Sequence, residues 1–157
     1  MKGCALKIAF SVVSIWCFVW APCLAAQNTA PVIAKPGAFK WNALMPGIEM
    51  TVLYGDPSKT GAYTIRLKME DGAKVPPHWH PEDENVTVLR GTFLAGMGDK
   101  FDAAALQELP PGSFVMMPKQ MHHFAQAKGQ TVLQLHGDGP FVVNYLNPAD
   151  DPAKAKP

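Results

Sequence analysis

Cysteine is missing from most of this chain of 157 residues, because its three cysteines, Cys4, Cys17 and Cys23, all lie near the N-terminus. Beyond Cys23 the chain can form no disulfide and offers no thiol for catalysis. A segment without disulfides has to be stabilised by its hydrophobic core or by a bound metal. The 131 residues that follow position 26 are enough to bury such a core within one domain.

An excess of charge of one sign is lacking as well. The whole chain has 14 basic and 13 acidic residues, so residues 27–157, which exclude Lys2 and Lys7, have 12 basic and 13 acidic residues and a net charge of −1 with histidine neutral. The basic residues are scattered along the sequence. Proteins that bind nucleic acid or anionic lipid gather basic residues on one face. We therefore expect no nucleic-acid partner.

Serine is almost absent after position 26, where only Ser58 and Ser113 occur. Ser113 lies in the stretch PPGSF, which lacks the strand, sharp turn and helix that present a serine nucleophile in hydrolases. A Ser–His–Asp hydrolase is therefore excluded.

A long uncharged run occurs only at the N-terminus. Two lysines precede the nineteen uncharged residues 8–26, which end in small side chains, as in a secretory signal peptide. Cleavage after Ala25 or Ala26 fits this pattern, and the sequence predicts a signal peptide over residues 1–26. An uncleaved anchor is the alternative, because about 20 residues span a bilayer, but Pro22 and the alanines favour cleavage. We expect a periplasmic protein that is not attached to the membrane after cleavage.

The rest of the chain consists of short apolar runs separated by turns rich in Gly, Pro and Asp, with no sustained helical period. The runs, which are rich in Val, Thr, Leu, Phe and Tyr, are residues 48–55, 62–69, 84–98, 113–118, 122–127, 131–137 and 141–146. Only residues 102–109 could form a helical turn or two. The sequence predicts an all-β domain of seven or more strands, folded as a sandwich or barrel.

The flanks of this β region have few large apolar side chains. Residues 27–40 are predicted to be a flexible lead-in, residues 41–147 the barrel, and residues 148–157, with three prolines, a disordered tail.

The densest group of polar residues is the stretch HWHPEDE, residues 78–84. Residues two apart on a strand point to the same face, about 6.6–6.8 Å apart, so His78 and His80 can approach one point while Trp79 faces away. Glu84 follows a turn and begins the next strand. A metal ion could lie between these side chains, with a fourth ligand from a distant segment. The remaining histidines are His122, His123 and His136.

Two spaced motifs surround these residues. The first is Gly72, five residues, His78-Trp79-His80, three residues, Glu84, six residues and Gly91. The second is Gly112, five residues, Pro118, one residue, Gln120, two residues and His123. This double pattern resembles the two motifs of the cupin superfamily, and the chain is similar to exported single-domain cupin-2 proteins of bacteria. It departs from the pattern at Gln120, where glycine is usual, and at Ala127, where asparagine is often found.

The resemblance implies a small RmlC-like jelly-roll barrel with a metal inside it. It implies the ligand set His78, His80, Glu84 and His123 and a divalent transition metal, which could be iron, manganese, nickel or zinc. It also implies a homodimer that binds a small-molecule substrate or ligand. The expected activity is that of a dioxygenase-like oxidoreductase acting on a small organic molecule. The alternative is a protein without catalytic activity that binds a metal or small ligand, or acts as a sensor.

Four further residues are candidates for the wall of the pocket. Gln134 and His136 share one face of their strand, and that face could point inward or outward. Arg66, in the stretch YTIRLKM, is a weaker candidate of the same kind. His122 would replace His123 in the site if a bulge shifted the register of the strand.

Overall fold

The computed structural model describes residues 30–154, so the predicted signal peptide lies outside the described residues. Residues 32–154 belong to one compact unit of the chain, and the fold is described within that unit. Between residues 30 and 154, no helix is long and apolar enough to cross a membrane.

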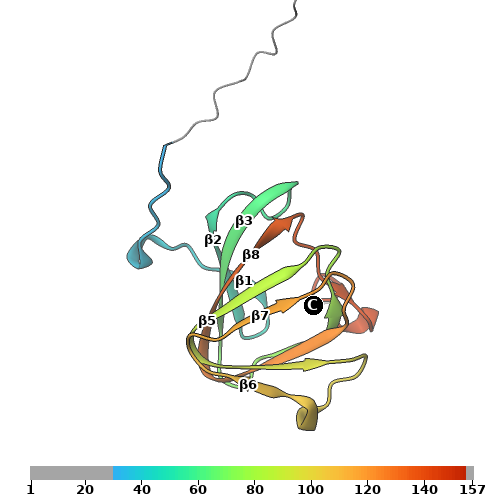
Figure 1. Cartoon of the computed structure of the whole chain (residues 1–157). Helices are drawn as coiled ribbons and strands as arrows, with labels where there is room; N and C mark the ends of the chain where they lie inside the picture. Colours follow the sequence, from blue (N-terminus) through green and yellow to red (C-terminus); the bar gives the residue numbers. More distant parts are fainter. Residues whose placement is uncertain (1–29, 155–157) are drawn as a thin grey trace, which may run out of the picture. The chain divides into compact units, whose positions relative to one another are not determined.

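The described residues form an antiparallel β structure with three short 3-10 helices (Figure 1). The strands are β1 (Asn42–Met45), β2 (Ile48–Tyr54), β3 (Gly61–Met69), β4 (Lys74–Trp79), β5 (Glu84–Met97), β6 (Gln107–Leu109), β7 (Phe114–Met117), β8 (His123–Gly139) and β9 (Asn144–Tyr145). The 3-10 helices are η1 (Pro36–Ala38), η2 (Ala103–Ala105) and η3 (Pro148–Asp150). The prediction of an all-β fold is confirmed.

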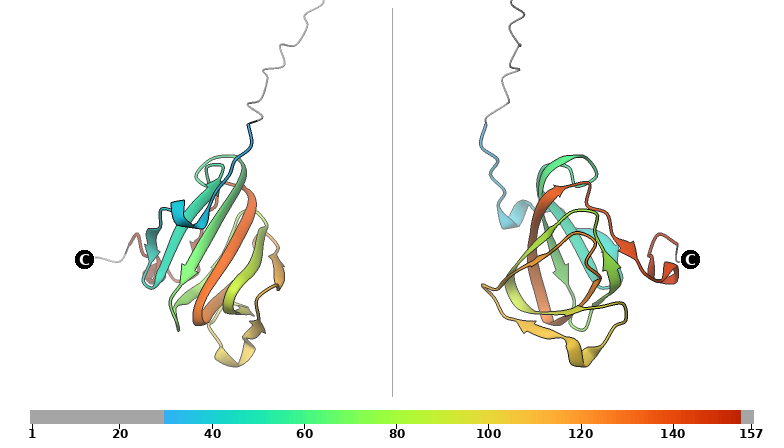
Figure 2. Two further views of the ribbon diagram at one scale, coloured as in Figure 1. Left: turned by 90° about the vertical axis from the view of Figure 1, so that its left-hand side faces the viewer. Right: turned by 45° about the vertical axis from the view of Figure 1, so that its right-hand side comes forward.

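The two longest strands, β5 and β8, close the sheet into a barrel. Strand β8 pairs with β5 along most of its length. On its other side β8 pairs first with β4 and then, over residues 131–139, with β3. The remaining pairings give the order β1-β2-β3-β8-β4-β9, while β6 and β7 both pair with β5. Figures 1 and 2 show the strands curling around one interior, which is the jelly-roll barrel expected from the sequence.

Alternation along the strands decides which side chains fill that interior. On β3, Ile65, Leu67 and Met69 are buried while the residues that alternate with them, Arg66 and Lys68, are partly exposed. Leu133 on β8 has the same inward orientation and is 1% exposed. Burying an aliphatic side chain of this size contributes roughly 1.5–3 kcal/mol, so the inward set stabilises the fold and fixes the register of each strand.

Glycine is required in the middle of β5. Gly91 has φ 74°, and a Cβ atom there would lie 2.5 Å from the carbonyl oxygen of Gln130. The pairing of β5 with β8 shifts register between Val88 and Arg90 and again across Gly91, between Arg90 and Thr92. Gly91 therefore allows both long strands to bend at the same level, and this explains its place at the end of the first motif.

Two segments differ from the expectations. Residues 102–109 form the short helix η2 followed by strand β6. The described part of the expected disordered tail, residues 148–154, contains η3 and a further turn. Side-chain oxygens of Asn147 and Asp151 accept hydrogen bonds from the amides of Ala149 and Ala153 at 3.1 and 3.0 Å. These caps order a proline-rich segment that composition alone suggests is disordered.

Candidate metal centre

Three histidines from two strands meet inside the barrel. His78 lies near the end of β4, His80 directly follows that strand, and His123 begins β8. His78 and His123 are register partners where the two strands pair. Each of the three side chains is buried, and their ligand atoms all lie within 4.8 Å of one another. The pairing of β4 with β8 thus unites the histidines of both sequence motifs.

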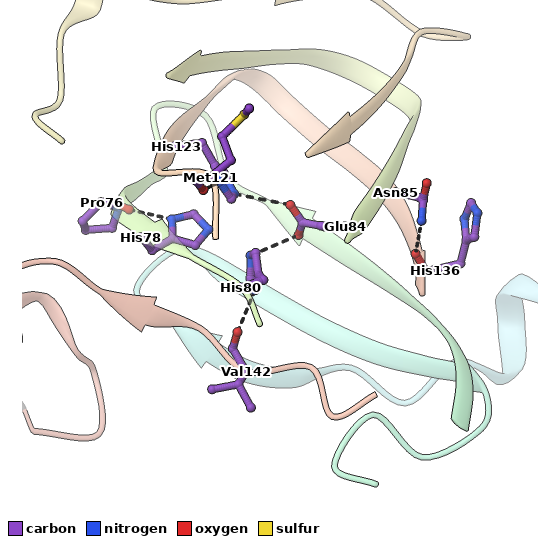
Figure 3. A network of polar contacts seen from close by, with 9 residues as sticks. All are labelled: Pro76, His78, His80, Glu84, Asn85, Met121, His123, His136 and Val142. Atoms are coloured by element: carbon purple, nitrogen blue, oxygen red, sulfur yellow. Dashed lines mark hydrogen bonds and ion pairs between the residues drawn. The ribbon is translucent and has the colours of Figure 1, made fainter. Parts of the chain in front are cut away.

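Backbone carbonyl groups fix the orientation of all three imidazole rings (Figure 3). The Nδ1 atom of each ring lies within hydrogen-bonding distance of a carbonyl oxygen. For His78, His80 and His123 these acceptors belong to Pro76, Val142 and Met121, at 2.8, 2.7 and 2.9 Å. A carbonyl oxygen only accepts, so Nδ1 carries the proton and donates it, and Nε2 keeps its lone pair. This is the tautomer that binds a metal through Nε2.

Two of these Nε2 atoms are buried without any hydrogen-bond partner, those of His80 and His123. Buried polar atoms in folded proteins are nearly always paired, so such atoms need an explanation. The carboxylate of Glu84 lies close to both, 3.6 Å from Nε2 of His80 and 3.5 Å from Nε2 of His123. A divalent transition metal fits this donor set, because it would satisfy both nitrogen lone pairs and the carboxylate together.

Glu84 is the first residue of β5, and it is 8% exposed. Burial is the largest single influence on its pKa and raises it, but His123, His80 and His78 together outweigh burial, so the pKa lies below its ordinary value. The carboxyl group is therefore ionised at neutral pH. An ionised carboxylate beside the neutral imidazoles of His78 and His80 is an attractive environment for a cation.

Two of the histidines, His78 and His80, are neutral at neutral pH. Burial, helped by the neighbouring His123 and His80, lowers the pKa of His78 to about 3. The pKa of His80 is also lowered, chiefly by burial. Because metal binding requires unprotonated imidazole, the fold holds these two side chains in the state that can bind.

The cluster lies at one end of a cavity of about 200 Å³ inside the barrel. Apart from the four polar groups of the cluster, two residues with polar side chains line it, Tyr145 and Asp151. The remaining lining residues are apolar: Leu44, Met45, Ile48, Leu67, Met69, Val75, Val86, Phe93, Ala125, Leu133, Leu135, Phe141, Val143 and Pro152.

The segment after β8 covers the histidines. The ring of Phe141 stacks on that of His80, with centroids 5.0 Å apart and planes inclined by 18°. Its neighbour Val142 supplies the carbonyl oxygen that orients His80. Farther along, the ring of Tyr145 lies 6.1 Å from that of His78. The C-terminal segment thus builds one wall of the site and holds His80 in its orientation.

Gln134 and Arg66 do not line the cavity. They are register partners on β8 and β3, and Arg66 donates a hydrogen bond from Nε to the side-chain oxygen of Gln134 at 3.1 Å. The guanidinium of Arg66 also lies over the ring of Phe39, 5.2 Å from its centroid. Both belong to the outer face of the barrel, because Leu133 and Leu135 occupy the inner face of β8.

His136 and His122 are outside the cavity as well. His136 is exposed on the outer face of β8, and its backbone carbonyl accepts a hydrogen bond from the side chain of Asn85 at 3.2 Å. Figure 3 shows it well apart from the cluster. Nδ1 of His122 lies 2.7 Å from a carboxylate oxygen of Asp99, at the surface. Of the adjacent histidines, therefore, His123 is the one that faces the interior.

Three residues that line the cavity, Phe141, Tyr145 and Asp151, are not predicted from the sequence. The stretch FVVNYL predicts only a strand, and its apolar character does not indicate that it packs against His78 and His80. Asp151 belongs to the segment expected to be disordered. One sequence feature indicates that the chain changes direction before Phe141. It is the turn sequence GDGP, residues 137–140, at the end of β8.

Comparison with known proteins agrees with this architecture. A family model described as a ChrR cupin-like domain matches residues 29–142. A germin-like protein, subfamily 1 member 1, of Arabidopsis thaliana is 34% identical over 95 residues, which make up 59% of this chain and 44% of that protein. The chain spans about half the length of the curated relatives it matches.

Solved structures share the fold at low sequence identity. The polyketide cyclase RemF from Streptomyces resistomycificus matches with a TM-score of 0.63 and 18% identity, over 76% of this chain and 88% of that one. Salicylate 1,2-dioxygenase from Pseudoaminobacter salicylatoxidans, solved as adducts with gentisate, matches with a TM-score of 0.52 and 16% identity, over 62% of this chain and 26% of that one. At such identities the likeness concerns the fold alone.

Proposed function

The chain belongs to the cupin superfamily, in the family of the ChrR cupin-like domain, and on that basis we propose that it is a metal-dependent oxidoreductase of dioxygenase type that acts on a small organic molecule. The observation that supports this best is the pair of buried, unpartnered Nε2 atoms beside the ionised carboxylate of Glu84, at the end of an internal cavity. The solved dioxygenase of the same fold is consistent with the proposal.

We propose His78, His80, Glu84 and His123 as the ligands. Their hydrogen bonds to backbone carbonyls orient the three rings, and Glu84 supplies the negative charge. Three nitrogens and one oxygen, without a thiolate, suit iron, manganese, nickel or zinc. Bound iron or manganese would supply redox chemistry with oxygen, and nickel or zinc would supply Lewis acidity. The apolar residues around the cluster exclude water and hold a substrate next to it.

A second candidate function is the binding or sensing of a small ligand without turnover. The observation that favours it is the lining of the cavity, in which only Tyr145 and Asp151 add polar side chains to the proposed ligands. The described residues therefore offer no obvious acid–base pair near the centre. In a further alternative, the metal would serve mainly to stabilise the fold.

Export to the periplasm and assembly into a homodimer are also part of this proposal. The N-terminal pattern of two lysines, a long uncharged run and small residues supports export. A small jelly roll with sheet edges to cover supports a dimer. Cell fractionation tests the first, and light scattering coupled to size-exclusion chromatography tests the second.

Metal analysis combined with oxygen uptake tests the function. The protein is isolated from its native compartment, its metal content is measured, and oxygen consumption is followed with phenolic, thiol and dicarboxylate compounds. We expect about one metal ion per chain, lost in His78→Ala and His80→Ala and retained in the control His136→Ala, whose side chain is exposed on the outer face. Unchanged metal in the first two variants contradicts the site. Bound metal with saturable ligand binding but no oxygen uptake favours the second candidate.

A further inference from the structure

The turn of residues 118–121 leads from β7 towards β8 and connects two parts of the proposed metal centre. It follows Met117, the last residue of β7, which is the register partner of Glu84 at the start of β5. It precedes β8, which begins at His123. A shift of this turn would therefore change how Glu84 and His123 lie relative to each other.

The same turn orients one of the imidazole rings directly. Its last residue, Met121, supplies the carbonyl oxygen that lies 2.9 Å from Nδ1 of His123 (Figure 3). The amide of Met121 donates to the carbonyl oxygen of Pro118 at 3.1 Å, which closes the turn. The direction of the His123 ring thus depends on the conformation of residues 118–121.

Contacts from the first motif hold this turn in place. The amide of Gln120 donates to the backbone carbonyl of His80 at 2.8 Å, and the amide of Lys119 donates to the side chain of Asp83 at 2.8 Å. Between them the backbone of Gln120 has φ 63°, a left-handed conformation that persists only where the surroundings fix it. The turn of the second motif is therefore held at two adjacent amides by the first.

Asp83 makes its contact through a side chain, so the contact can be removed by substitution. Its Oδ1 atom accepts the hydrogen bond from a residue 36 positions later in the chain. Hydrogen bonds to a carboxylate are stronger than those between neutral groups. Because Asp83 is exposed, a shorter side chain there leaves no cavity in the core, and the lost hydrogen bond is the main consequence.

From these contacts we infer that Asp83 is a positioning residue of the metal centre, because its hydrogen bond holds the turn of residues 118–121 in the conformation that orients His123. In that orientation Nε2 of His123 lies 3.5 Å from the carboxylate of Glu84. The inference rests on the proposed function, since it concerns the same proposed ligands, but it assigns Asp83 no contact with the metal.

Zinc affinity tests this role in variants of the full chain. Zinc is titrated into each metal-free protein in competition with a chromogenic chelator. Asp83→Ala removes the hydrogen-bond acceptor and should weaken zinc binding about three- to tenfold, the effect of one hydrogen bond. Asp83→Asn removes the charge but keeps a side-chain oxygen that accepts, so it should restore most of the affinity lost in the alanine variant.

The matched control is Glu82→Ala, because Glu82 is the exposed neighbour of Asp83 in the same turn. This change takes away one negative charge and leaves the hydrogen bond between Asp83 and Lys119 in place, so zinc affinity should stay close to that of wild type. An equal loss in Glu82→Ala and Asp83→Ala would mean that Asp83 acts only through its charge and would overturn the inference. Failure of Asp83→Asn to restore affinity would do the same.

The ring of His123 gives a second measurement that needs no metal. In chelator-treated protein at mildly alkaline pH, nitrogen NMR distinguishes an imidazole protonated at Nδ1 from one that exchanges between its two tautomers. We expect the proton at Nδ1 of His123 in wild type, Asp83→Asn and Glu82→Ala, and a mixture of tautomers in Asp83→Ala. A ring that stays protonated at Nδ1 in Asp83→Ala overturns the inference.

Urea unfolding of the metal-free variants separates positioning from a general effect on stability. If Asp83→Ala unfolds more easily while its zinc affinity and the His123 signal match those of wild type, Asp83 only stabilises the fold and the inference is wrong. If wild type itself binds no zinc, the proposed metal centre is wrong, and the tautomer of His123 still decides whether Asp83 orients that ring.

Discussion

The imidazole rings of His78 and His123 lie with their centroids 4.1 Å apart, because the two residues are register partners where β4 pairs with β8. The first belongs to a local cluster of polar residues and the second to a segment much later in the chain. A metal bound between them would join the two strands, so its binding free energy would also stabilise the fold.

Replacing His123 should weaken metal binding, whereas replacing its neighbour His122 should not. His123→Ala removes a buried imidazole whose Nε2 has no other partner, and we expect metal affinity to fall at least about tenfold. The control His122→Ala removes a surface side chain that contacts Asp99. Metal content after dialysis against a weak chelator measures the difference. Equal retention in both variants would place the site elsewhere.

The negative charge of Glu84 should matter more than its shape. Glu84→Gln keeps the size of the side chain but removes the charge that lies beside His80 and His123, so we expect metal affinity to fall about tenfold or more. Glu82→Gln is the matched control, because Glu82 is exposed in the turn between β4 and β5. Competition titrations with a chromogenic chelator give both affinities, and a Glu84→Gln variant that binds like wild type excludes this residue as a ligand.

The metal-free protein should lose stability as the pH falls below about 6.5. Folded His78 has a pKa of about 3, against an ordinary value of 6.5. Between these values the unfolded chain takes up a proton that the folded state does not, so the free energy of unfolding decreases by roughly 1.4 kcal/mol per pH unit for this group. The lowered pKa of His80 acts in the same direction.

Urea unfolding in the presence of a chelator, at several pH values from neutral to acidic, measures this slope. His78→Asn is the comparison, since asparagine does not titrate and the slope should become shallower. A free energy of unfolding that stays constant or rises on acidification contradicts the burial of neutral histidine.

The histidine cluster could be predicted from the sequence because its signals are local. His78 and His80 are two residues apart at the end of one extended segment, and alternation places them on one face. Choosing His123 over His122 needed the spacing of the second motif, which counts residues from Gly112 and Pro118. That a metal binds there stays a prediction.

The remainder of the pocket depends on contacts between distant segments. Alternation shows that Gln134 and His136 share a face but not whether that face is inward. The direction is set by the whole barrel, in which Leu133 and Leu135 are buried. Likewise, the approach of Tyr145 to His78 results from the pairing of β9 with β4, which no pattern within residues 141–146 reveals.

Gln120, the position at which the second motif departs from glycine, should be a site where glycine stabilises the protein. Its φ of 63° is in the left-handed region, which costs roughly 1–2 kcal/mol for a residue with a Cβ, while glycine loses about 0.5–1 kcal/mol in conformational entropy. Its amide donates to the carbonyl oxygen of His80 at 2.8 Å, and glycine keeps that bond. We therefore expect Gln120→Gly to raise the free energy of unfolding by about 0.5–1 kcal/mol.

The matched control for this change is Gln126→Gly, because Gln126 lies within β8 and pairs with Lys74 and Leu94. In an extended strand glycine brings only the entropic cost, so this variant should lose about 0.5–1 kcal/mol. Chemical denaturation of both variants without metal gives the two values. The two changes in the free energy of unfolding should have opposite signs, because glycine relieves backbone strain at position 120 and adds conformational freedom to the unfolded chain at position 126. A loss of stability in both variants would mean that the backbone at Gln120 is not strained.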